Sequence, residues 1–185
     1  FSRGPALWLS LAVLFSGSAW RIAGIFRLKS KPDFSEPRGR SLLAGALSTI
    51  VSRMFPRKEF LHGTALVFLN AYVYHIGLAI IVFGYLPHVN FIKRLVGISW
   101  PVPWTWVFYV AVGFTFISML IAIIHRFTDP VRHLLSNYDD YFSWGVVFLP
   151  MVTGMAALGG VSSEIAPGEP LYPAPVAVHL LSVEL

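Results

Sequence analysis

Four stretches of this sequence are long enough and apolar enough to cross a membrane as helices. A bilayer core of about 30 Å needs roughly 20 apolar residues in helical conformation. Residues 62–86, 104–124 and 141–161 contain no Asp, Glu, Lys or Arg. Residues 5–26 contain only Arg21, which lies near the end of its stretch and can extend its charge to the interface. The pattern predicts an all-α protein, a polytopic membrane helix bundle.

A fifth apolar run begins near Pro173 and continues to Leu185. From Val176 it has only ten residues, which are too few to span a bilayer. Such a stub inside the bilayer would leave its last carbonyl groups unpaired. We therefore expect five transmembrane helices, the fifth truncated because the chain is a fragment, in a single membrane-embedded domain, 1–185.

The composition supports this class and excludes several others. Apolar residues make up 56% of the chain and charged residues 12%, whereas a soluble domain has about 45–50% and about 25%. We therefore do not expect an ordinary cytosolic enzyme, a disordered regulator or a nucleic-acid-binding domain. The net charge of +5 fits a membrane protein, because the Lys and Arg residues cluster beside the apolar stretches. The absence of Cys excludes disulfides, thiolate zinc sites and Cys-ligated iron–sulfur clusters within this chain.

The loops predict an orientation. The basic loop 27–60 carries eight Lys and Arg against three Asp and Glu. Residues 125–140 add two arginines, whereas loop 162–172 has two Glu and no basic residue. The positive-inside rule then places 27–60 and 125–140 in the cytoplasm and the N-terminus outside.

Two connecting segments carry further signals. Residues 41–54 place apolar side chains at helical spacing between basic flanks, so they form either an interfacial helix or a linker helix packed on a partner. Segment 98–106 contains three Trp and two Pro, which is typical of the aromatic belt at a membrane interface.

The histidines are the candidate functional residues, because neither Cys nor an acidic residue lies within the second to fourth stretches. A titratable side chain inside a membrane helix is costly and marks a candidate site. His75 lies thirteen residues from both His62 and His88, near the middle of its stretch. We predict that His75 is an axial ligand of a buried haem iron; a hydrogen-bonded core histidine is the alternative.

His88 and His179 are the other predicted haem ligands. His88 follows Pro87 at the outer end of the same helix, about 20 Å from His75 at a rise of about 1.5 Å per residue. His179 lies early in the fifth helix and is expected at the depth of His88. An outer haem held by His88 and His179 is therefore expected, and the partner of His75 would follow Leu185.

The remaining histidines have weaker signals. His62, beside Pro56-Arg57-Lys58-Glu59, is expected at the cytoplasmic interface, with a role at a quinone or proton site as the functional alternative. His125 and His133 lie among arginines and are expected to face solvent, lipid headgroups or a partner. Tyr138-Asp139-Asp140 is expected to cap the fourth helix.

A series of short motifs extends over essentially the whole chain in a fixed order. They are Gly4-Pro5 with Arg21, Tyr74-His75-Ile76-Gly77-Leu78, Leu86-Pro87-His88, Gly97-Ile98-Ser99-Trp100-Pro101, His125-Arg126, Asp129-Pro130-Val131-Arg132, Asp139-Asp140-Tyr141, Pro150 with Thr153-Gly154, and Val178-His179-Leu180-Leu181-Ser182-Val183-Glu184-Leu185. In these motifs the chain resembles the cytochrome b (gamma) subunit of respiratory nitrate reductase. It resembles more closely the related membrane cytochrome b subunits in redox complexes of sulfate reducers and sulfur oxidisers.

The resemblance implies a five-helix subunit of the prokaryotic cytoplasmic membrane that binds two b-type haems between its second and fifth helices. Such subunits exchange electrons with a quinone pool and with iron–sulfur and catalytic partner subunits. Two departures stand out. The two helix-two ligands of the nitrate reductase subunit are closer together than His75 and His88, and Tyr85, the nearest equivalent, is a poor haem b ligand. The family's last helix-five histidine has no counterpart in this chain.

We therefore expect a di-haem b subunit that transfers electrons between the quinone pool and partner subunits and is not catalytic alone. The basic loop 27–60 is the expected docking surface for such a partner, although lipid headgroups explain the same charges. Two other functions stay open. One is a haem-free membrane anchor, and the other is a small transporter, for which broken helices and acidic residues at mid-membrane would be typical.

Overall fold

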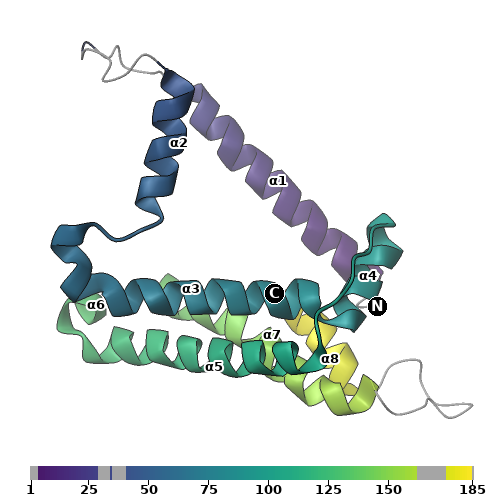
Figure 1. The fold of residues 1–185 in the computed structure, drawn as a ribbon. Helices are drawn as coiled ribbons and strands as arrows, with labels where there is room; N and C mark the ends of the chain where they lie inside the picture. Colours follow the sequence, from purple (N-terminus) through teal and green to yellow (C-terminus); the bar gives the residue numbers. More distant parts are fainter. Residues whose placement is uncertain (1–3, 29–33, 35–40, 162–173, 185) are drawn as a thin grey trace, which may run out of the picture. The chain divides into compact units, whose positions relative to one another are not determined.

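The structure, a computed structural model, describes residues 4–28, 34, 41–161 and 174–184 (Figure 1). Every regular element in these residues is a helix, which confirms the all-α prediction. The elements are α1 (Pro5–Arg27), α2 (Leu42–Arg53), the 3-10 helix η1 (Lys58–Phe60), α3 (Leu61–Gly84), α4 (Leu86–Val96), α5 (Thr105–Thr128), α6 (Pro130–Leu135), α7 (Tyr138–Val161) and α8 (Ala174–Val183).

Four described segments are long and apolar enough to cross a membrane. They are Pro5–Arg27, Leu42–Gly84, Thr105–Thr128 and Tyr138–Leu158. The second joins α2 to α3, and α3 alone has 24 residues. The prediction of a membrane protein is thus supported at four of the expected positions. The fifth crossing and the outside N-terminus stay predictions.

The chain divides into two compact units, and each is described by itself. One unit is 37–136, which contains α2 to α6. The other combines residues 1–36 with 137–185 and contains α1, α7 and α8. His75 and His88 belong to the first unit and His179 to the second.

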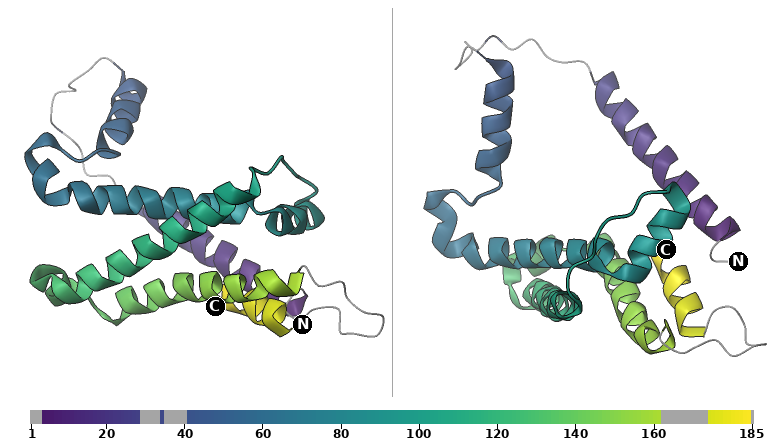
Figure 2. Two further views of the ribbon diagram at one scale, coloured as in Figure 1. Left: turned by 60° about the horizontal axis from the view of Figure 1, so that its bottom comes forward. Right: turned by 45° about the vertical axis from the view of Figure 1, so that its right-hand side comes forward.

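In the first unit, α3 and α5 pack against each other at a point where their backbones come very close (Figure 2). A Cβ atom added to Gly77 would lie 2.1 Å from Thr115 Oγ1 and 3.3 Å from the carbonyl oxygen of Ala111. Thr115 is fully buried, and its hydroxyl donates to that same carbonyl at 2.6 Å. Small residues allow such close approach between membrane helices, where lipid tails compete with apolar side chains for contact.

A reciprocal pair of hydrogen bonds joins the same two helices further along. The side-chain amide of Asn70 donates to the carbonyl oxygen of Ser118 at 3.0 Å, and the Ser118 hydroxyl donates to the carbonyl oxygen of Asn70 at 2.8 Å. Asn70 precedes Gly77 by seven residues, so both lie on one face of α3. This Asn70–Ser118 clasp therefore continues the same interface and satisfies the polar side chains within it.

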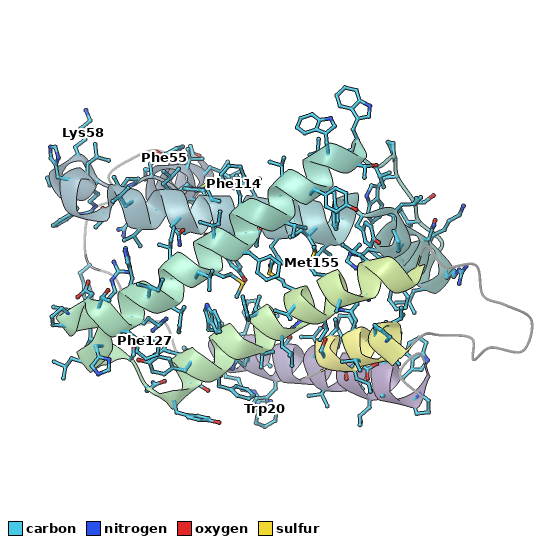
Figure 3. The ribbon with its side chains drawn as sticks, turned by 90° about the horizontal axis from the view of Figure 1, so that it is seen from below. Trp20, Phe55, Lys58, Phe114, Phe127 and Met155 are labelled. Carbon is cyan, nitrogen blue, oxygen red and sulfur yellow. The ribbon has the colours of Figure 1, made fainter. Side chains whose placement is uncertain are left out.

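In the second unit, α7 packs against α8, and the α1 side chain of Ser10 donates to the carbonyl oxygen of Glu184 at 3.3 Å. Most of α1 is uncovered, and Phe15 is 68% exposed. Trp20, on the same helix, is 76% exposed (Figure 3). Apolar side chains exposed along a helix of membrane-spanning length fit contact with lipid tails.

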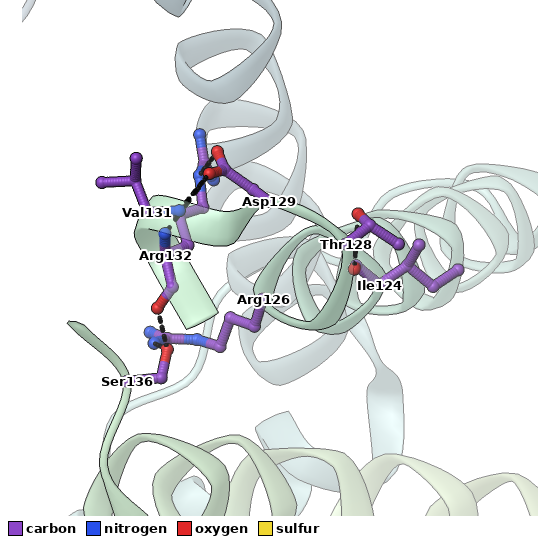
Figure 4. Close-up of polar contacts among 7 residues, drawn as sticks. All are labelled: Ile124, Arg126, Thr128, Asp129, Val131, Arg132 and Ser136. Atoms are coloured by element: carbon purple, nitrogen blue, oxygen red, sulfur yellow. Dashed lines mark hydrogen bonds and ion pairs between the residues drawn. The ribbon is translucent and has the colours of Figure 1, made fainter. Parts of the chain in front are cut away.

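Helix boundaries follow capping chemistry. Asp129 begins α6: its carboxylate accepts from the backbone N–H groups of Val131 and Arg132 and pairs with the Arg132 guanidinium at 3.1 Å (Figure 4). The pKa of Asp129 lies below its usual value, chiefly because the Arg132 backbone N–H donates to it. Asn137 and Asp140 form a reciprocal cap at the start of α7, with bonds of 3.0 and 3.2 Å. The predicted capping role of Asp140 is thereby confirmed.

One helical expectation is wrong. The sequence predicted that His88 continues the helix of His75, but α3 ends at Gly84, and Tyr85 has an extended backbone with φ −91° and ψ 122°. A new helix, α4, begins at Leu86 with Pro87 in its first turn. Proline has no N–H to donate to the carbonyl one turn earlier, and its ring clashes with that carbonyl inside a helix, whereas the first turn of a helix tolerates it, so the chain restarts rather than continues. The 20 Å separation inferred from continuous helical rise therefore does not apply.

Candidate functional site

His75 lies on α3 within a membrane-spanning segment. Its side chain is exposed rather than part of the α3–α5 interface. The ring Nδ1 lies 2.7 Å from the carbonyl oxygen of Ala71, one turn earlier. A carbonyl oxygen can only accept, so this contact places the proton of the neutral imidazole on Nδ1 and the lone pair on Nε2.

His88 is held at the break between α3 and α4. Its Nδ1 lies 2.9 Å from the carbonyl oxygen of Ile81, one of the four carbonyls that α3 leaves without a partner at its end. The same argument gives His88 a protonated Nδ1 when it is neutral. Burial lowers the pKa of His88, against the opposing effect of hydrogen bonds to Ile81 and Val82, so the ring favours the neutral form.

Residues around the break between α3 and α4 also hold the His88 ring in place. The indole N–H of Trp100 donates to the carbonyl oxygen of Phe83 at 2.6 Å, which satisfies a second terminal carbonyl of α3. Tyr85 lies between His88, edge-on at 5.1 Å between ring centroids, and the buried Phe108 of α5, stacked at 4.5 Å. The His88 ring is thus fixed by a hydrogen bond on one atom and an aromatic neighbour on its side.

His179 lies on α8, in the other unit, and packs onto α7. Its Nδ1 is 3.2 Å from the hydroxyl oxygen of Thr153. A Cβ atom added to Gly154 would lie 3.0 Å from His179 Cε1 and 3.3 Å from Nδ1. The missing side chain of Gly154 therefore provides the space in which the imidazole lies.

The six histidines divide into two groups by these contacts. The three predicted haem ligands, His75, His88 and His179, each place Nδ1 against an oxygen of the protein. In the part of the chain that the structure describes, the rings of His62, His125 and His133 make no hydrogen bond. Ligating histidines nearly always direct their other ring N–H to a carboxylate, a backbone carbonyl or water. The assignment of the first three as haem ligands stays a prediction.

The structure brings some of the predicted residues together and leaves other pairings as predictions. His75 and His88 lie in one unit, on two helices that adjoin at Tyr85. His179 lies in the other unit, so its pairing with His88 stays a prediction. Within the described residues no three His, Asp or Glu side chains gather to hold a metal ion, whereas a haem iron needs only two axial side chains.

Comparison with known proteins adds no relative. No protein-family model, no curated protein and no solved structure matches this chain. The resemblance to membrane cytochromes b therefore rests on the motifs of the sequence alone.

The sequence did not indicate which residues orient these rings. Thr153, Gly154 and Ser182 belong to the short motifs, but no pattern predicted a contact with a histidine. The spacing of His179 and Ser182, three residues apart on one helical face, was the available signal. Their partner helix was not readable from the sequence, because contacts between distant segments leave no periodic pattern.

Proposed function

We propose that this chain is a haem b-binding membrane subunit that transfers electrons between the quinone pool and the iron–sulfur or catalytic subunits of a respiratory complex. The observation that carries the proposal is the shared arrangement of His75, His88 and His179, whose Nδ1 atoms lie 2.7, 2.9 and 3.2 Å from protein oxygens. At His75 and His88 that oxygen is a carbonyl, which only accepts, so Nε2 is the lone-pair atom in the neutral ring. The proposal places the subunit in a prokaryotic cytoplasmic membrane, as the motif resemblance implies.

The donor set fits a haem iron. Neutral imidazole is a common axial ligand, and the chain has no Cys to compete with it. When bound, a haem supplies reversible one-electron chemistry in the membrane. The protein's part is to hold the imidazoles neutral and oriented. Ala71, Ile81 and Thr153 do so by fixing which nitrogen carries the proton.

The proposed partner surface is the basic loop 27–60. Arg27, Arg53, Arg57 and Lys58 are its described basic residues, and all four are exposed. Exposed cations favour docking of an acidic partner surface and raise its association rate. His62, exposed on the first turn of α3 and five residues after Arg57, is the proposed site for a quinone or for proton exchange.

The test is the visible spectrum of the purified protein. We expect dithionite-reduced minus air-oxidised spectra in mild detergent to contain haem b bands, and a reduced quinol analogue to produce the same bands. A colourless protein from haem-sufficient cells would contradict the proposal and favour the haem-free anchor. Solute flux in proteoliposomes without haem bands would favour the transporter.

A further inference from the structure

A small network of polar side chains surrounds His179 between α7 and α8. The sequence patterns gave its other members, Thr153 and Ser182, no function of their own. The hydroxyl of Thr153 lies 3.2 Å from His179 Nδ1 and 2.8 Å from the hydroxyl of Ser182. Ser182 is only 5% exposed, and its hydroxyl donates to the carbonyl oxygen of His179 at 2.7 Å. The three side chains come from both helices, so the network joins α7 to α8.

The direction of each hydrogen bond follows from the acceptors. The Thr153 hydroxyl has one proton and lies within 2.9 Å of the carbonyl oxygen of Leu149 and 3.2 Å of that of Pro150. These carbonyls can only accept, so the Thr153 proton is used there or toward Ser182. With its proton on one of these carbonyls, as the 2.9 Å contact with Leu149 favours, the hydroxyl accepts toward His179, and Nδ1 of the imidazole is then the donor.

Gly154 leaves the space in which the ring of His179 lies. The imidazole lies so close to α7 that a Cβ atom at Gly154 would be 3.0 Å from its Cε1 atom. In contrast, a Cβ atom at Gly145, on the same helix, would have no atom within 4 Å. The small residue is therefore required at the position that the ring of His179 covers.

We propose that Thr153 is a positioning residue for His179, which accepts the Nδ1 proton so that Nε2 is presented as the haem-iron ligand, while Gly154 sets the plane of the ring. This inference rests on the proposed function. A hydrogen bond from the non-ligating nitrogen fixes the tautomer and raises the basicity of the ligand. A more basic ligand stabilises ferric over ferrous iron, so Thr153 lowers the midpoint potential of the haem that His179 holds.

The decisive variants are Thr153→Val, which removes the hydroxyl at nearly constant volume, and Thr153→Ser, which keeps it. We expect Thr153→Val to bind one haem 10- to 100-fold more weakly, the usual cost of losing such a partner, and to raise the potential of the haem that remains bound. Thr153→Ser should restore both properties. Thr128→Val is the matched control, because the Thr128 hydroxyl also bonds to a carbonyl one turn back, that of Ile124, and makes no hydrogen bond to a histidine within the described residues.

A second measurement separates this inference from the proposed function. In protein from haem-deficient cells, nitrogen NMR of ¹⁵N-labelled histidine reports which ring nitrogen of His179 carries the proton. We expect Nδ1–H in the wild type and in Thr153→Ser, and a mixture of tautomers in Thr153→Val. A predominant Nε2–H tautomer in the wild type, or equal haem affinity and potential in Thr153→Val and wild type, would overturn the role of Thr153. Wild-type protein with the expected tautomer but no haem from haem-sufficient cells would overturn the proposed function instead.

The steric part is tested by Gly154→Ala against Gly145→Ala. We expect Gly154→Ala to change the low-spin ferric electron paramagnetic resonance signal of one haem, because the ring plane turns when the added methyl group displaces it. Gly145→Ala should leave that signal unchanged. An unchanged signal in Gly154→Ala would contradict the steric role.

Discussion

The Nδ1 atom of His88 lies 2.9 Å from the carbonyl oxygen of Ile81, across the break that separates α4 from α3. The imidazole thus serves as a cap for a helix that it does not belong to. In a membrane protein this matters, because an unsatisfied carbonyl at a helix end costs several kcal/mol where no water reaches it. The same bond fixes the ring of a proposed haem ligand, so fold and site share one contact.

Trp100 provides the second cap of α3, which can be tested separately from haem binding. Replacing Trp100 with Phe keeps an aromatic ring but removes the N–H that donates to the carbonyl oxygen of Phe83. We expect Trp100→Phe to reduce the free energy of unfolding by about 1 kcal/mol. Unfolding in mixed micelles with increasing dodecyl sulfate measures this. Trp106→Phe, at an exposed Trp without a described hydrogen bond, is the control and should change stability much less.

The lowered pKa of His88 predicts a pH dependence of stability. Burial holds the folded pKa below the ordinary value near 6.5, so the unfolded chain binds the proton more readily. The contribution of His88 to the free energy of unfolding is therefore fully present above about pH 6.5. It is lost as the pH falls toward and through the pKa of His88 in the folded protein. For protein from haem-deficient cells, melting temperatures in detergent between pH 7.5 and pH 5 should fall less for His88→Asn than for the wild type. Parallel curves would contradict the prediction.

The close approach at Gly77 predicts a substitution and its rescue. Gly77→Ala places a methyl group 2.1 Å from Thr115 Oγ1 and should destabilise the α3–α5 pair by about 1–3 kcal/mol. Thr115→Ala removes that oxygen, and the next contact, with the Ala111 carbonyl, is 3.3 Å. The double variant should therefore be more stable than Gly77→Ala alone. Gly113→Ala, with no atom within 4 Å of its added Cβ, is the control. Absence of rescue would contradict the close contact.

The Asn70–Ser118 clasp predicts the cost of two substitutions. Each bond runs from a side chain to a backbone carbonyl oxygen, at 3.0 and 2.8 Å, and that carbonyl stays when its own side chain is replaced by Ala. Asn70→Ala and Ser118→Ala should each reduce the free energy of unfolding by about 0.6 kcal/mol and by at most about 1.7 kcal/mol, and the two losses should add in the double variant. Ser52→Ala, whose hydroxyl bonds to the carbonyl oxygen of Thr49 in the same helix, is the control and should cost less. Equal losses in Ser52→Ala and Ser118→Ala would contradict the clasp.

Much of the architecture follows from sequence patterns that act locally. Apolar length predicted the membrane helices, and the acidic residues after Asn137 predicted the cap of α7. The break before His88 was misjudged, although Pro87 marked it, because apolar character continues through Gly84 and Tyr85. Hydropathy reports whether a segment prefers lipid and does not report whether its backbone is continuous.

Local sequence patterns did not predict how the rings of the candidate ligands are oriented. His75 bonds to a carbonyl four residues back, which helical geometry alone supplies. The partners of His88 and His179 come from a helix end and from a neighbouring helix. These partners depend on tertiary packing, so the sequence indicated the candidate ligands but not the groups that orient them.

The haem content of six single variants tests the central claim most directly. Each histidine is replaced by Ala in turn, and haem b per polypeptide is measured from the pyridine haemochrome spectrum. We predict that His75→Ala, His88→Ala and His179→Ala each lose haem, whereas His62→Ala, His125→Ala and His133→Ala keep the wild-type ratio. Wild-type protein without haem, or losses that do not follow this division, would contradict the account.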